Sequence, residues 1–169
     1  TEDTNRFRYR LRLSLDSEIS PNFFAGVRIT TGNEDNPVST NETLGDFKNK
    51  DSIVLDRAFL QWKPSLEFDF WGGRFANPYF STPLVWDGDI NFEGIAGGFN
   101  RESGKELRPF VTAGIFPLQD VEFGSSKWFW ALQGGTEYRP RADIISKVGL
   151  AWYDYQNMRS EERRVGKEC

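Results

Sequence analysis

Polar and apolar residues alternate without exception near the start of the chain. Between residues 6 and 15 every odd position is apolar or aromatic and every even position is polar, and four of the even positions are arginine. A period of two predicts a β-strand, because successive side chains of a strand point to opposite faces, and no helix has this period. The strand would therefore have one apolar face and one arginine-rich face.

Similar alternation recurs along the chain and predicts further strands. The predicted ranges are 23–31, 52–63, 66–76, 92–100, 108–116, 128–138 and 144–155. Residues 53, 55, 56 and 59 blur the alternation of the range 52–63. No segment has a helical period or an apolar run of the length that a transmembrane helix needs. The pattern predicts an all-β fold of about eight antiparallel strands.

The segments between the predicted strands alternate in length. Short connections at 16–22, 64–65, 101–107 and 139–143 are interleaved with longer ones at 32–51, 77–91 and 117–127. An up-and-down β-barrel of the outer membrane has this layout, with tight turns at one end and long loops at the other. A strand of about ten residues, tilted by roughly 40°, also rises by about 25 Å, the height of the apolar band of such barrels.

Composition agrees with two-faced strands and excludes several kinds of chemistry. Aromatic residues make up 15% of the chain although its mean hydropathy is −0.58, as expected if half of each strand faces lipid and half faces water. The absence of histidine excludes Ser-His-Asp and Cys-His catalysis and histidine-bearing zinc sites within this chain. A single cysteine, Cys169, excludes an internal disulfide. We expect no enzymatic activity and no cofactor.

The arginine face must be wet or lined by acids. Alternate residues of a strand lie roughly 7 Å apart, so neighbouring guanidinium groups repel by about 2 kcal/mol at an effective dielectric constant of 20. Arginine cannot relieve this repulsion by losing its proton. Glu67, Asp69 and Glu137 are candidate acids on neighbouring strands. For Glu67 and Asp69 we favour a role in lining a lumen over a role in acid–base catalysis. The face is either a solvated sheet surface or the wall of a water-filled pore.

Three stretches of the chain resemble the outer-membrane porin family of Gram-negative bacteria. They are Arg8-Tyr-Arg-Leu-Arg-Leu, the loop from Arg28-Ile-Thr-Thr-Gly-Asn through Thr40-Asn-Glu-Thr-Leu-Gly, and Gly73-Arg-Phe-Ala-Asn-Pro-Tyr-Phe-Ser-Thr-Pro-Leu-Val-Trp-Asp. The resemblance implies a transmembrane β-barrel in the outer membrane that lets ions and small hydrophilic solutes diffuse passively. It also implies contact with lipid, no nucleic-acid partner, and a homo-oligomer such as a trimer.

The resemblance further implies that this chain is an internal piece of a larger barrel, with a cleaved signal peptide and additional strands on either side. The C-terminal aromatic residue common in such barrels is missing. Residues 159–169 resemble the translation of a sequencing-library adapter, so we expect the barrel domain to span residues 1–158. The expected pore-lining residues are Arg6, Arg8, Arg10, Arg12, Arg28, Glu67, Asp69, Glu137 and Lys147. Because these residues include both positive and negative charges, they do not predict whether the pore prefers anions or cations.

Two loops have candidate chemistry. Asp87, Asp89 and Asn91 have the spacing that opens a calcium loop, but Phe92 stands where glycine is needed and Gly98 where the bidentate glutamate belongs. Solvated loop acids are therefore the favoured interpretation, and a metal site is a weak alternative. The acidic loop 33–51 is either a charged surface loop or a loop that folds inward and narrows the pore.

Two other folds fit the same pattern. A soluble all-β binding domain, either a sandwich or a lipocalin-like barrel, would turn the apolar face inward. A small closed eight-stranded barrel in the outer membrane would need no further strands. Extraction distinguishes the first from a porin, because a porin needs detergent and a soluble domain needs only buffer. The full-length gene would give the strand number and the true ends.

Overall fold

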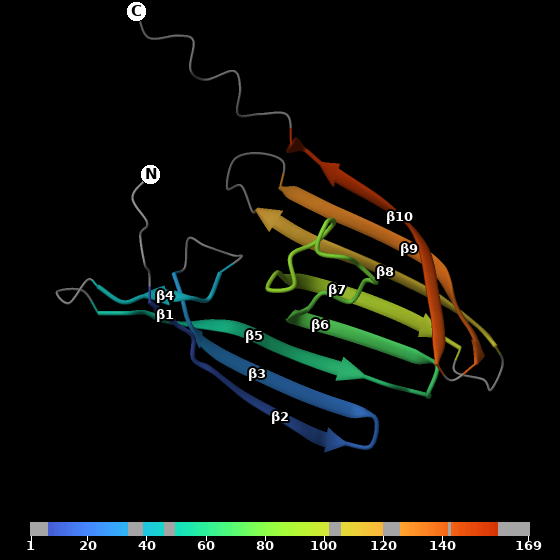
Figure 1. The fold of residues 1–169 in the computed structure, drawn as a ribbon, viewed down its shortest axis with the longest axis horizontal. Coiled ribbons are helices and arrows are strands. Elements are labelled where there is room, and N and C mark those ends of the chain that lie inside the picture. The colour runs from blue at the N-terminus through green and yellow to red at the C-terminus, as the bar shows by residue number, and fades with distance from the viewer. Residues whose placement is uncertain are drawn as a thin grey trace, which may run out of the picture. The chain divides into compact units, whose positions relative to one another are not determined.

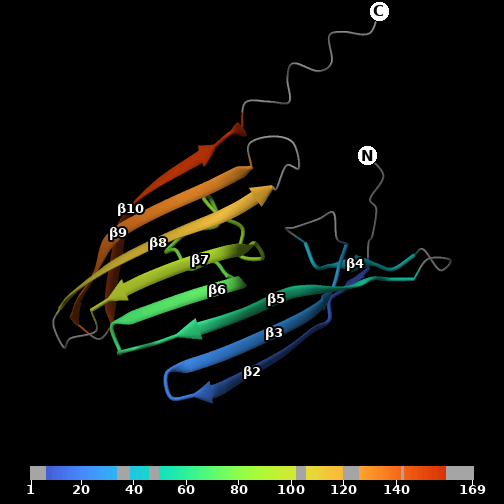
Figure 2. The same cartoon turned by 180° about the vertical axis from the view of Figure 1, so that it is seen from behind.

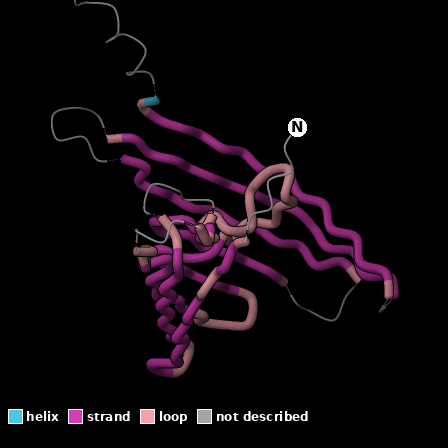
Figure 3. Tube along the Cα trace, turned by 60° about the vertical axis from the view of Figure 1, so that its left-hand side comes forward, coloured by secondary structure: helices cyan, strands magenta, loops and turns pink. Residues whose placement is uncertain are grey.

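The computed structural model of the chain describes residues 7–33, 39–45, 50–101, 106–119, 126–141 and 143–158. All ten elements that it describes are strands, and Figure 3 shows them in magenta. No helix in these ranges is both long enough and apolar enough to span a membrane. The strands are β1 (Arg8–Tyr9), β2 (Arg12–Ser20), β3 (Phe23–Thr31), β4 (Glu42–Thr43), β5 (Ile53–Trp62), β6 (Phe68–Ala76), β7 (Asn91–Asn100), β8 (Leu107–Gln119), β9 (Lys127–Arg141) and β10 (Ile144–Gln156).

Eight strands form one sheet in the order β10-β9-β8-β7-β6-β5-β3-β2, and β1 pairs with β4 in a small second sheet. The main sheet follows chain order, as expected for a meander of up-and-down strands. The predicted all-β antiparallel architecture is confirmed. Within the described residues the sheet is open, with β2 and β10 at its edges, and no closed barrel forms. The chain divides into two compact units, Thr1–Trp62 with Trp71–Phe92 and Lys63–Phe70 with Glu93–Cys169.

In the first unit, β2, β3 and β5 lie side by side (Figure 1). The predicted range 23–31 coincides with β3, and β5 lies within the predicted range 52–63. The predicted turn at 16–22 is wrong, because β2 continues to Ser20 and only Pro21 and Asn22 form the turn. Glu18 still pairs with Phe24, so cross-strand pairing outweighs the local turn preference of this segment. Asn22 takes the left-handed conformation (φ 71°) that suits a tight hairpin.

The predicted strand 6–15 is divided into two strands. Arg8 pairs with Thr43 in the small β1–β4 sheet, and β2 begins only at Arg12. Figure 2 shows β4 beyond the end of β2 at which that strand begins. Between the two strands the Leu11 backbone N–H donates to Thr31 Oγ1 (3.1 Å), so the break is stabilised from β3. Part of the expected loop 32–51 is thus strand β4, and Arg6 lies outside the described residues.

A β-bulge at Asp56 explains the blurred alternation of β5. Arg28 pairs with Arg57 but the next residue, Ile29, pairs with Leu55, so Asp56 is the extra residue. The extra residue exchanges the two faces, and the apolar face therefore uses odd positions before Asp56 and even positions after it. A register shift of this kind is invisible to a search for strict alternation.

In the second unit, β8, β9 and β10 lie side by side (Figure 1), and β8 and β9 are longer than predicted. One face of these strands is buried and includes stacked rings of Phe116 and Phe129, whose centroids are 5.5 Å apart. The register places Phe129 opposite Tyr155, with ring centroids 4.6 Å apart. The opposite face exposes the large apolar side chains of Val111, Ile115, Trp130, Leu132, Leu150 and Trp152.

Candidate functional site

Each unit exposes rows of large apolar side chains on one face of its strands. Leu15 on β2 is 74% exposed and Leu150 on β10 is 84% exposed. Soluble proteins rarely expose contiguous apolar patches, because each Å² of apolar surface costs about 25 cal/mol in water. The outward rows of the first unit are Leu13, Leu15, Val27, Ile29, Leu55 and Leu60. Such a face needs an apolar environment.

Aromatic side chains gather near the ends of the strands on this apolar face. In the first unit, Phe23 stacks on Trp62 with ring centroids 5.8 Å apart, where β3 begins and β5 ends. In the second unit, Phe68 at the start of β6 lies 5.1 Å from Phe99 near the end of β7. Aromatic residues near strand ends, with aliphatic residues between them, are typical of membrane-spanning β-sheets.

The polar face of the first unit contains an arginine pair directly across two strands. Arg28 on β3 is opposite Arg57 on β5. Like charges in this position repel. The bulge residue Asp56, only 6% exposed, forms an ion pair with Arg28. Asn91 joins the group: its Oδ1 accepts a hydrogen bond from Arg57 Nε (2.8 Å) and its Nδ2 donates to Asp56 Oδ1 (2.6 Å).

Two loop segments contact Arg10, which precedes β2, and Arg12, which is the first residue of β2. Arg12 contacts Asp89 at 2.8 Å and Arg10 contacts it at 3.4 Å. Arg12 also donates to Thr40 Oγ1, and Arg10 Nε donates to Asn41 Oδ1, both at 2.8 Å. The hydrogen bond from Arg12 and the charges of Arg12, Arg10 and Arg28 lower the pKa of Asp89 below 3.8, against a smaller opposing effect of burial. Segments 77–90 and 39–45 are thus both held on this polar face.

We call the joined residues the arginine network. It consists of Arg10, Arg12, Arg28, Arg57, Arg74, Asp56, Asp89 and Asn91. Arg74 belongs to it because its Nε donates to the Asp56 backbone oxygen at 3.0 Å.

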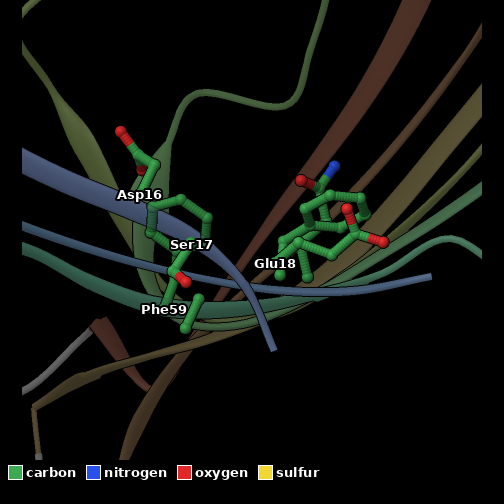
Figure 4. Close-up of a pocket in the computed structure, with 7 residues that line it drawn as sticks. Asp16, Ser17, Glu18 and Phe59 are labelled. Carbon is green, nitrogen blue, oxygen red and sulfur yellow. The ribbon is translucent and has the colours of Figure 1, made fainter. Parts of the chain in front are cut away.

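A pocket of about 320 Å³ lies further along the same three strands, toward the turn between β2 and β3 (Figure 4). Gly26 makes room for two of the lining side chains, since a Cβ at this position would lie 2.5 Å from both Asp16 Oδ1 and a Phe59 ring carbon. The lining residues are Asp16, Ser17, Glu18, Phe24, Ala25, Phe59 and Gln61. Acids and aromatic rings therefore follow the arginines along this part of the sheet.

The family is settled by comparison with known protein families. A family model described as "Putative porin" matches residues 1–168. The chain belongs to this porin family. No curated protein matches it. The resemblance found in the sequence is confirmed, and membership supports a porin-like role and an outer-membrane location in general.

The first unit of the porin brings several predicted pore-lining residues together. Arg10, Arg12 and Arg28 belong to the arginine network, whereas Arg8 is exposed on β1. The acids that contact these arginines are Asp56 and Asp89.

The remaining predicted residues lie in the second unit. Asp69 forms an ion pair with Lys63 at 3.4 Å, and Glu137 forms one with Arg139. Glu67 lies in the turn before β6, where its backbone oxygen accepts a hydrogen bond from the Asn100 N–H (2.8 Å). Lys147 is opposite Glu137 across β9 and β10, and its Nζ lies 4.5 Å from the centre of the Phe110 ring.

In the porin, the three residues that were weak candidates for metal ligands make other contacts. Asp89 faces two guanidinium groups, Asn91 bridges Asp56 and Arg57, and Asp87 accepts the Asp89 N–H at 2.8 Å. A cation at Asp89 would have to compete with two arginines. Within the described ranges, no three His, Cys, Asp or Glu side chains cluster as metal ligands would.

Sequence reasoning did not single out Asp56, Arg57 and Arg74 as site residues. For Asp56 the bulge is the reason, because it places this residue on the polar face out of strict alternation. A usable signal was the charged pair Asp56-Arg57 inside a strand that is otherwise mainly apolar.

Proposed function

We propose that this chain forms part of the wall of a water-filled β-barrel channel in the outer membrane, through which ions and small hydrophilic solutes diffuse passively. One observation carries the proposal: each strand pair of the first unit sets a row of exposed apolar side chains against a face of arginines and acids. Lipid satisfies the first face and a water-filled lumen satisfies the second. Family membership supports the same conclusion.

A membrane location requires the open edges of the sheet to be paired. Strands β2 and β10 each have a neighbour on one side only within the described residues. Each unpaired backbone polar group costs several kcal/mol in the hydrocarbon of a bilayer. The channel therefore needs a closed barrel, in which these edges pair with each other, with further strands, or with a neighbouring chain.

Passive diffusion needs no catalytic residue. A wet, charged wall replaces part of the hydration shell of a passing ion and favours some solutes over others. We accordingly assign the arginine network to the lumen wall, together with Asp69, Glu137 and Lys147. The proposed partners are outer-membrane lipid and the solutes, with no cofactor.

Conductance in a planar bilayer tests this function. The full-length gene product, purified in detergent and inserted into the bilayer, should give stepwise ion currents. Absence of current from correctly folded protein would reject the channel. Recovery of the protein from membranes with buffer alone, without detergent, would instead favour a soluble all-β domain.

A further inference from the structure

The arginine network has more positive than negative charge. Its five arginines face only two aspartates, Asp56 and Asp89. The next acid along the face is Asp16, which lies two residues beyond the Ser14 that pairs with Arg28. Even with Asp16 and the next acid, Glu18, included, these residues have one positive charge in excess.

Arg57 lacks the ion pair with a carboxylate that Arg10, Arg12 and Arg28 have. Its Nε donates to Asn91, whose amide is neutral, and it forms no ion pair with any described residue. The neighbouring carboxylate of Asp56 is already engaged by Arg28 and Asn91. A guanidinium group has five N–H donors in a planar fork, so most donors of Arg57 are free to bind a ligand.

The network is also short of hydrogen-bond acceptors. Arg12 Nε is buried and has no acceptor among the described residues. Arg28 Nη2 is buried against the same Asp56 oxygen that accepts from Arg28 Nε, so one carboxylate oxygen faces both nitrogens. Buried donors without acceptors cost free energy, which an incoming acceptor would recover after a small side-chain movement.

We propose that Arg12, Arg28 and Arg57 form a binding site for oxyanions, meaning solutes with a carboxylate or a phosphate group, on the channel wall. The proposal rests on the proposed channel function and adds a class of solute to it. Paired oxygens of an oxyanion match the guanidinium fork, whereas a halide can accept only as a single point. The site selects its ligand by charge and by this geometry. Asn91 occupies only the Nε donor of Arg57, so the other donors of Arg57 can bind the oxyanion.

Block of chloride current by inorganic phosphate, measured on the full-length protein in a planar bilayer, tests the site. Phosphate should reduce the wild-type current, and Arg57→Gln should raise the half-blocking concentration about tenfold, as expected for loss of one charge-assisted contact. Arg57→Lys keeps the charge but loses the fork, so its value should lie between the two. Acetate in place of phosphate tests the carboxylate form of the ligand.

The control is Arg101→Gln, which removes the same charge from an exposed position directly after β7 and should behave like wild type. Equal phosphate block of wild type and Arg57→Gln, or no block of either, overturns the oxyanion site while the chloride current still supports the channel. Calorimetric titration of phosphate into the detergent-folded protein gives a second readout that needs no conduction. Binding heat that survives Arg57→Gln unchanged would likewise overturn the site.

Discussion

At the scale of single residues, Asp56 and Asp89 determine how the arginines coexist. Asp56 is buried between Arg28, Arg57 and Asn91, so it offsets repulsion between arginines directly opposite each other. Asp89, which lies in a loop, offsets the repulsion between Arg10 and Arg12 by contacting both. The sequence predicted that the arginines need acids nearby, because charge and spacing demand it. It did not predict which acids, because the bulge and the loop contacts depend on the folded chain.

The lowered pKa of Asp89 gives a pH prediction. A carboxyl group whose folded pKa lies below its unfolded value stabilises the fold above that unfolded value and stops doing so as pH falls through the folded pKa. Asp89 should therefore contribute fully at neutral pH and down to about pH 4, and should lose its contribution below its ordinary value of 3.8. Urea midpoints of wild type and Asp89→Asn, measured from pH 7 to pH 2, check this.

The two midpoints should differ by a constant amount above pH 4 and converge at lower pH. Acid unfolding at other carboxyl groups affects both proteins and cancels in the comparison. A difference that grows as the pH falls, or one that is absent at pH 7, contradicts the assigned contact.

At the scale of elements, the strands follow from alternation and their interruptions follow from contacts. The predicted ranges for β3, β7 and β10 agree with the structure to within one residue at each end. Alternation predicts these strands well because a period of two is a local property of the sequence. Interruptions such as the bulge at Asp56 and the break before Arg12 depend on pairing with distant segments, so they could not be read from the pattern.

Adjacent glycines on β9 give an element-scale prediction. A Cβ on Gly135 would lie 2.2 Å from the Val148 backbone oxygen and 2.4 Å from a Phe110 ring carbon, whereas a Cβ on Gly134 meets nothing within 4 Å. Gly135→Ala should therefore lower the free energy of unfolding by about 1–3 kcal/mol, as overpacking typically does. Gly134→Ala is the control and should change it little.

Urea unfolding of both variants in the same detergent or lipid provides the measurement. Close packing involves Gly135, which faces the Phe110 ring, and not Gly134. Equal stability of the two variants would show that the backbone around Gly135 adjusts without cost.

At the scale of the whole molecule, the faces of the sheet carry the function. Rows of exposed leucine, isoleucine, valine and tryptophan need an apolar environment, which lipid supplies in the proposed channel, and the arginine network needs water. Period-two patterning predicted this division from sequence, and the porin family match agrees with it. Closure into a transmembrane barrel, which the sequence also predicted, stays a prediction, because the described sheet is open and a repeated strand pattern does not give the number of strands.

Lipid quenching along β10 tests the two-faced wall most directly. Single cysteines at 149, 150 and 151, introduced into the full-length protein with any other cysteine replaced by serine, carry a fluorophore, and the protein is folded into bilayers of brominated lipid. The register places Leu150 on the apolar face and Gly149 and Ala151 on the opposite face. We predict strong quenching at 150 and weak quenching at 149 and 151. Equal quenching at all three positions, or none at 150, would contradict a sheet with one face in lipid and the other in water.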